Sequence, residues 1–158
     1  MMIYDRIPQE CTKEELKIFK ELVSVAGEVI STSLNSLVNR AYKLIFITDN
    51  NEIIGIAGVK NPNQSYIEKI SKKTSIKISN NMKELGWIYI LPEYQGQGLA
   101  NKLMEYIYKN ILNDIECYAT TREKNNVMKH LLEKYLFDVS GEKYASENGN
   151  YNLELYVK

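Results

Sequence analysis

The stretch from residue 84 to residue 107 restricts the fold more than any other part of the chain. A continuous apolar run, Leu85–Leu91, ends at Pro92, and glycines at positions 96 and 98 precede an amphipathic helical pattern. An uninterrupted apolar run of this length is typical of a strand that is buried on both faces. A buried strand that leads through a glycine loop into a helix indicates a crossover unit of a mixed α/β domain.

The start of the first helix is predicted by the residues at its N-terminus. Thr12 and Glu15 have the spacing of a capping box, in which each side chain bonds the main chain of the other. Apolar residues follow at three- and four-residue intervals, and Val29 and Ile30 are the last of them. We therefore expect an amphipathic helix over residues 13–30.

A hairpin is predicted around Asp49-Asn50-Asn51, because these residues tolerate positive φ and separate two apolar, β-rich runs. The complete order is β, α, α, β, β, then β, α, β, α, β, β, which predicts a single mixed α/β domain over residues 1–158. Strands are expected at residues 2–7, 42–48, 52–59, 85–91, 115–120, 137–145 and 151–157, helices at 13–30, 33–41, 99–112 and 125–136, and a helical turn at 65–73 between the two halves of this order.

Composition narrows the class of protein. Twenty Lys and Arg residues balance 20 Asp and Glu residues, so the chain lacks the cationic excess that favours nucleic-acid binding. Cys11 and Cys117 form no disulfide framework, and His130 is the single histidine, so no metal site is expected. The N-terminus has no signal-peptide pattern, and no apolar run reaches the roughly 18 residues of a membrane span. We expect a soluble, reduced, cytoplasmic protein.

The glycine loop has the composition of an anion-binding site. Glycines allow the main chain to approach phosphate oxygens, and the N–H groups of the first helical turn have no partner within the helix. Ala100 keeps that first turn narrow. The P-loop string is absent, and the third glycine of a dinucleotide fingerprint would fall on Asn101. A simple turn is the alternative interpretation of this Gly-x-Gly.

The string GWIYILPEYQGQGLANKLM resembles motif A of the GNAT N-acetyltransferase superfamily, whose signature is Arg/Gln-x-x-Gly-x-Gly/Ala. Gln95, Gly98 and Ala100 occupy its three defined positions. The later string ATTREKNNVMKHLLEKYLF resembles the family segment in which an asparagine, here Asn125, opens a helix that ends before a phenylalanine, here Phe137. The resemblance implies a central mixed, mostly antiparallel sheet of about six or seven strands flanked by about four helices.

The same resemblance implies acetyl-CoA (coenzyme A) as the cofactor. A strand opened by a bulge would offer its free main-chain groups to the amides of pantetheine, and the N–H of Ile90 would face the thioester oxygen. Asn125 would bond the pantetheine or cysteamine part. The implied contacts are Ile88, Tyr89 and Ile90 for pantetheine, and Gln95, Gly96, Gln97, Gly98, Leu99 and Ala100 for the pyrophosphate.

Acetyl transfer to an amine needs a base, because a lysine-like amine with a pKa of about 10.4 is mostly protonated at pH 7. Glu84 stands where many members of the family keep a glutamate base; the alternative is a solvated glutamate at the start of the strand. The family position for a tyrosine acid is Leu132, and the glycine expected before Phe137 is Leu136. Tyr89 or Tyr135 could replace the acid, or each could be core or pocket wall.

These residues together predict an N-acetyltransferase that joins acetyl-CoA and an amine in a ternary complex, with direct attack of the amine. The expected acceptor is a small-molecule or peptide amine. A homodimer is compatible with the sequence. The polar stretch 60–83, which includes Tyr66, is either an acceptor-side wall or a connector. A non-catalytic acyl-CoA-binding or interaction module with the same fold is the alternative function.

Overall fold

Two neighbouring strands, β2 (Lys43–Asp49) and β3 (Glu52–Lys60), are buried along most of their length. Successive residues Leu44–Ile47 of β2 are all inaccessible to solvent, so both faces of the sheet are covered at this strand. Asn50 and Asn51 join the two strands with φ values of 49° and 66°, as a tight hairpin turn of the primed type requires. The predicted hairpin is confirmed.

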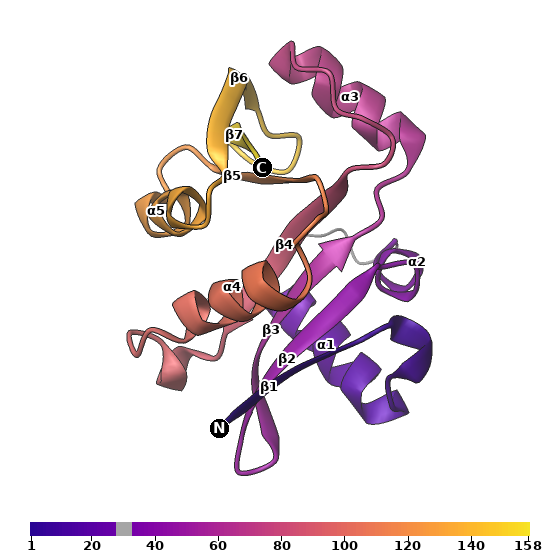
Figure 1. The fold of residues 1–158 in the computed structure, drawn as a ribbon, viewed down its shortest axis with the longest axis vertical. Coiled ribbons are helices and arrows are strands. Elements are labelled where there is room, and N and C mark those ends of the chain that lie inside the picture. Colours follow the sequence, from indigo (N-terminus) through magenta and orange to yellow (C-terminus); the bar gives the residue numbers. More distant parts are fainter. Residues whose placement is uncertain (28–32) are drawn as a thin grey trace. The chain divides into compact units, whose positions relative to one another are not determined.

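The computed structural model describes residues 1–27 and 33–158. In these residues the strands follow the hydrogen-bonded order β1-β2-β3-β4-β5-β7-β6, and β4 and β5 pair in parallel (Figure 1). The predicted mixed α/β class with a mostly antiparallel sheet is confirmed. The remaining elements are β1 (Met2–Arg6), α1 (Lys13–Ala26), α2 (Leu34–Asn39), α3 (Gln64–Thr74), β4 (Lys83–Ile90), α4 (Leu99–Asn110), β5 (Cys117–Arg122), α5 (Asn126–Lys134), β6 (Asp138–Ala145) and β7 (Asn152–Val157), with 3₁₀ turns at Pro8–Glu10 and Pro92–Tyr94.

The chain divides into two compact units that share strand β4. The first unit contains Met1–Asn61 and Leu85–Ile107, and the second contains Pro62–Glu84 and Tyr108–Lys158. Each unit has a hydrophobic core of its own, and each is described separately below.

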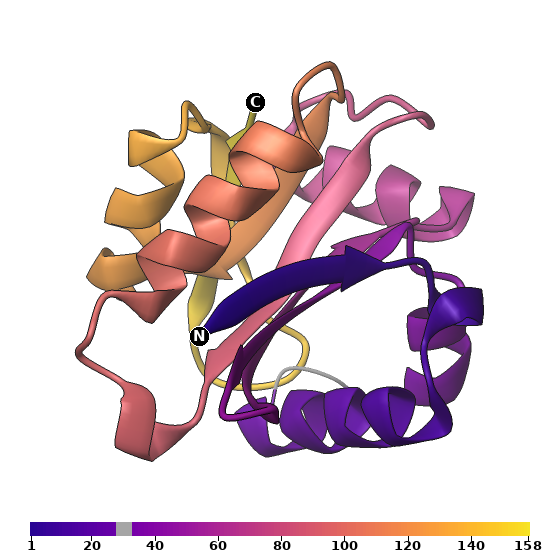
Figure 2. The same cartoon turned by 60° about the horizontal axis from the view of Figure 1, so that its bottom comes forward.

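Helix α1 provides one side of the core of the first unit and runs beneath its strands in Figure 2. Phe19 of α1 makes edge-on contacts with the rings of Phe46 and Trp87, at 5.7 Å in both cases. The capping box of Thr12 and Glu15 is present, which confirms that prediction.

The C-terminal end of α1 differs from its predicted position. The prediction extended the helix to Ile30, but α1 ends at Ala26 because Gly27 adopts a left-handed conformation with φ 73°. Val29 and Ile30 lie outside the described residues.

Strand β4 does not have the continuous burial that its apolar run predicts. Gly86, Ile88 and Tyr89 are partly exposed, so the expectation of a strand buried on both faces is wrong for β4. The same strand has a kink at Trp87, whose φ of 54° is rare for a bulky residue and costs about 1–2 kcal/mol. The indole ring lies over Gly58 of β3, where an added Cβ would come within 2.5 Å of it.

The core of the second unit lies between helix α3 and strands β5 and β7. Ile67 and Ile70 of α3 pack with Tyr118 of β5 and Leu155 of β7. Asn63 caps α3 by accepting a hydrogen bond from the main-chain N–H of Tyr66 at 2.8 Å. The helical turn predicted at 65–73 lies within this longer helix of 11 residues, and the cap orients Tyr66.

Helix α5 ends in a turn that a glycine would normally make. Leu136 has a φ of 69°, and its side chain is 62% exposed. The next N–H, that of Phe137, bonds the carbonyl of Leu132 at 3.0 Å, as in a Schellman motif. A leucine in this conformation strains the backbone and contributes little packing in return.

We therefore expect Leu136→Gly to raise the free energy of unfolding by about 0.5 kcal/mol, because relief of the left-handed strain exceeds the entropic cost of glycine. Urea denaturation measures this change. Leu136→Ala is the control, since it removes the exposed side chain but keeps the strained Cβ and should not stabilise the protein. A lower stability of the glycine variant would contradict the assignment of strain.

Candidate active site

The loop between β4 and α4 has the backbone conformation of an anion-binding turn. Gly96 and Gly98 have φ values of 77° and 76°, and both are exposed. A Cβ built on either glycine meets no atom within 4 Å, so close packing does not explain why glycine stands here. The glycines provide the left-handed conformation and leave open space above the main chain. A phosphate group fits these two properties.

Helix α4 begins directly behind this loop. The N–H of Lys102 bonds the carbonyl of Gly98 at 3.1 Å, which makes Gly98 the cap of the helix. Leu99 is buried and anchors the first turn in the core, so it can meet a ligand only through its main chain. The N–H groups of this turn lack intrahelical acceptors, and the helix dipole adds roughly half a positive charge.

The side chain of Gln95 has a structural partner. Its amide nitrogen donates a hydrogen bond to the carbonyl of Ile90 at 2.8 Å and thereby ties the start of the loop to the end of β4. Gln97 is exposed beside the two glycines. The family resemblance implies that both residues contact the pyrophosphate. In the structure, the side chain of Gln95 also fixes the loop.

The strand residues of the predicted pantetheine contact follow the kink at Trp87. The bulge expected in this strand stays a prediction, and the irregularity that the structure shows there is the positive φ of Trp87. Ile88 is partly exposed, Tyr89 packs partly against the core of the first unit, and the side chain of Ile90 is buried. Their main chain is the part that could meet a ligand.

Glu84, the predicted base, is a buried residue of the second unit. Its side chain is only 4% exposed, so the alternative of a solvated glutamate is wrong. The hydroxyl of Tyr66 donates a hydrogen bond to its Oε2 at 3.2 Å. The parallel ladder places Glu84 opposite Tyr118 of β5. A carboxyl group enclosed in this way costs free energy unless it is bonded, and such groups are frequent at functional sites.

The Glu84 carboxyl group affects the pKa of three tyrosines. Burial and then the charge of Glu84 raise the pKa of Tyr66 and Tyr118 far above the ordinary value, and the same causes raise the pKa of Tyr144 to about 12. The phenols therefore stay protonated over the pH range in which enzymes work. The sequence singles out Tyr66 as a wall residue, whereas Tyr118 and Tyr144 carry no signal in it.

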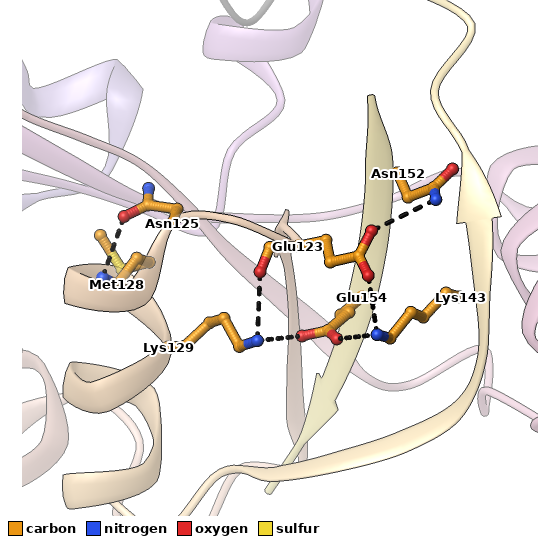
Figure 3. A network of polar contacts seen from close by, with 7 residues as sticks. All are labelled: Glu123, Asn125, Met128, Lys129, Lys143, Asn152 and Glu154. Carbon is orange, nitrogen blue, oxygen red and sulfur yellow. Dashed lines mark hydrogen bonds and ion pairs between the residues drawn. The ribbon is translucent and has the colours of Figure 1, made fainter. Parts of the chain in front are cut away.

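Asn125 caps helix α5. Its Oδ1 accepts a hydrogen bond from the N–H of Met128 at 3.1 Å, and Figure 3 shows the amide nitrogen turned away from this bond. The nitrogen can thus donate to a ligand while the oxygen holds the helix. Tyr135 lies at the other end of α5, is buried and contacts the ring of Tyr108 at 5.7 Å. Leu132, at the position of the family acid, is buried as well.

A cavity of about 430 Å³ lies beside β1 in the first unit, lined by residues that include Tyr4, Asp5 and Arg6. Burial opposes ionisation of Asp5, but bonds from Lys43 at 2.8 Å and from the hydroxyl of Tyr106 at 2.7 Å outweigh it and lower the pKa of Asp5. This carboxylate is already bonded within the protein, so the cavity offers no ready base.

In residues 1–27 and 33–158, no group of three or more His, Cys, Asp or Glu side chains is arranged to hold a metal ion. Within the same residues, no helix is both long enough and apolar enough to cross a membrane.

A mixed sheet with a glycine loop that leads into α4 is therefore the framework of the candidate site. The family model described as the acetyltransferase (GNAT) family matches residues 10–136. The chain therefore belongs to the GNAT acetyltransferase family. No curated protein sequence matches it.

Solved structures agree with this fold along the whole chain. An acyl-CoA N-acyltransferase from Pseudomonas aeruginosa is 13% identical, with a TM-score of 0.72, and the match covers 99% of this chain and 98% of that one. The ribosomal-protein-S18-alanine N-acetyltransferase from Escherichia coli is 15% identical, with a TM-score of 0.68 and coverage of 99% and 92%. Arabidopsis thaliana NAA60, in complex with acetyl-CoA, is 16% identical, with a TM-score of 0.69 and coverage of 99% of both chains.

Tyr66 donates a hydrogen bond to Glu84, and Tyr118 lies opposite Glu84 in the strand register. Removal of the two hydroxyl groups should have different effects on stability. Tyr66→Phe removes a donor from a buried carboxyl group and should lower the free energy of unfolding by about 1 kcal/mol. Tyr118→Phe is the matched control, because the Tyr118 hydroxyl is buried without a hydrogen-bond partner among the described residues. This second variant should be neutral or stabilising in urea denaturation. Equal losses in both variants would contradict the hydrogen-bond assignment.

Proposed function

We propose that this protein transfers an acetyl group from acetyl-CoA to an amine of a small molecule or peptide, by direct attack in a ternary complex. The observation that carries the proposal is the exposed turn with left-handed glycines at positions 96 and 98, directly before the N-terminus of α4. Membership of the GNAT family supports acyl-CoA as the donor.

The proposed cofactor contacts are mostly main-chain groups. In the first unit, the N–H groups from Gln95 to Ala100 would hold the pyrophosphate, and Ile88–Ile90 would pair with pantetheine. In the second unit, the amide nitrogen of Asn125 would donate a hydrogen bond to the cofactor. Acetyl-CoA supplies an acetyl thioester, whose carbonyl carbon a neutral amine can attack.

Glu84 is proposed as the base that removes a proton from the incoming ammonium group. The Glu84 carboxyl group is buried, and the hydroxyl of Tyr66 fixes one of its oxygens. Tyr118 and Tyr144 surround it with phenols that remain neutral, so they cannot compete with it as bases at neutral pH. These contacts support the proposal that Glu84 is the general base.

Tyr89 and Tyr135 are the candidates for the acid. Leu132 occupies the position of the family tyrosine, and Tyr135 and Tyr89 both pack against hydrophobic neighbours. A thiol with a pKa of about 8.5 leaves readily as a thiolate, so transfer does not require an acid. The buried Leu132 is also the observation that favours the alternative function, a non-catalytic acyl-CoA-binding module. Release of free thiol in the presence of amines separates the two functions.

The acceptor class follows from the solved relatives only in outline. The Escherichia coli relative is described as acting on an alanine of a ribosomal protein, and another solved relative is described as a putative phosphinothricin N-acetyltransferase. Peptide amines and small-molecule amines therefore both belong in an assay panel.

Titration calorimetry with acetyl-CoA tests the cofactor proposal. The wild-type protein should bind, and Gly98→Asp should weaken binding at least tenfold, because a carboxylate would stand in the anion cradle. Gly27→Asp is the matched control: its φ of 73° and open surroundings match those of Gly98, but it lies at the end of α1. It should lose similar stability and no affinity. No heat with the wild-type protein at millimolar acetyl-CoA would refute the proposal.

The base proposal is tested by Glu84→Gln, assayed with a polyamine, an amino acid and a short peptide with a free N-terminus. The rate at pH 7 should fall about 10²-fold, and its rise toward alkaline pH should follow only the deprotonation of the amine. Affinity for acetyl-CoA should not change. Glu68→Gln, on the exposed face of α3, is the control. A pH–rate profile that superimposes on the wild-type profile would remove Glu84 from this role.

A further inference from the structure

Strand β7 carries a carboxylate that is almost completely buried. Glu154 is 4% exposed, and two lysines from different elements neutralise it: Lys129 of α5 at 3.0 Å and Lys143 of β6 at 3.4 Å (Figure 3). A buried carboxylate is costly unless it is paired, and such a pair adds little net stability compared with apolar residues. Net stability therefore does not explain why this network is present, and another role must be considered.

An irregularity in β6 brings Lys143 into the network. Ser140 pairs with Leu155 and Tyr144 pairs with Leu153, so the stretch 141–143 lies opposite the single residue Glu154. Gly141 allows this bulge with a φ of 70°. The bulge leaves the ammonium group of Lys143 within reach of Glu154 and of Glu123, the latter at 2.8 Å.

Lys129 connects the network to the start of α5. Besides the Glu154 carboxylate, its ammonium group bonds the main-chain carbonyl of Glu123 at 3.1 Å, in the turn between β5 and α5. The N–H of Lys129 bonds the carbonyl of Asn125 at 3.0 Å. One side chain therefore joins strand β7, the turn that precedes the helix, and the first turn of α5 itself.

The same turn fixes the orientation of Asn125. The N–H of Asn125 bonds the carbonyl of Arg122 at 3.0 Å, and its side-chain oxygen caps the helix. Glu123 is fixed through both its main chain and its side chain. Its N–H bonds the carbonyl of Asn152 at 2.9 Å, and its carboxylate accepts a hydrogen bond from the side-chain amide of Asn152 at 3.2 Å. The direction of the Asn125 amide nitrogen thus depends on groups that Lys129 and Glu154 hold in place.

We infer that Lys129 and Glu154 are positioning residues, which hold the Asn125 amide in the orientation that binds the cofactor. The inference rests on the proposed function, in which Asn125 donates to acetyl-CoA. Neither residue needs to touch the cofactor, because both act through the backbone of residues 122–125. A purely structural network would affect stability without a specific link to Asn125.

A double-mutant cycle on acetyl-CoA affinity tests this link. Asn125→Ala should raise the dissociation constant about tenfold, and Lys129→Met about fivefold. In the double variant, Lys129→Met should add no further loss, because the group that it orients is gone. Lys129→Arg, which can make both contacts, should stay within about twofold of the wild-type protein. Additive losses in the double variant would overturn the inference, as would an unchanged affinity of Lys129→Met or of Asn125→Ala.

Two controls keep the outcome specific. Lys69→Met removes a helix lysine that is paired with Glu147, so it matches the loss of charge and of an ion pair elsewhere in the second unit, and its affinity should not change. Lys129→Met leaves Glu154 paired with Lys143, so folding should persist; Lys129→Gln is the second variant if it does not. Absence of binding by the wild-type protein would refute the proposed function, whereas wild-type binding with an additive cycle would refute the positioning role alone.

Discussion

The packing of Trp87 is the interaction on which the first unit depends most. A left-handed conformation in the middle of a strand is unfavourable for a tryptophan, so it persists only because the indole ring is held by its neighbours. Gly58 leaves room for the ring, Phe19 contacts its edge, and the ammonium group of Lys60 lies 4.7 Å from its centre. The kink that results directs the main chain of the following residues, which the proposed function uses for the cofactor.

Local features of the fold were predictable from the sequence because their causes are local. The capping box, the hairpin at Asn50 and Asn51 and the order of elements all depend on residues a few positions apart. The glycine loop belongs to the same group, because two glycines directly before an amphipathic helix favour a turn with positive φ. The end of α1 has a local signal as well, the left-handed Gly27, but the apolar spacing that continues to Ile30 favoured a longer helix.

The surroundings of the candidate base could not be read from the sequence. Glu84 meets Tyr118 because two strands pair in parallel, and it meets Tyr66 because α3 packs in the same unit; in each case the partner is distant in sequence. The burial of β4 was mispredicted for a related reason. An apolar run does not show which positions a kink will turn toward solvent, and here β2 and β3 have the burial that β4 lacks.

The exposed glycine turn has a consequence for how such proteins diverge. A ligand held by main-chain N–H groups places demands on backbone shape and few demands on side-chain identity. An exposed position such as Gln97 can then accept other side chains, whereas a residue with a Cβ would strain the left-handed backbone at Gly98. Selection on a turn of this kind acts on conformation, so a cofactor site could outlast the replacement of most of the residues around it.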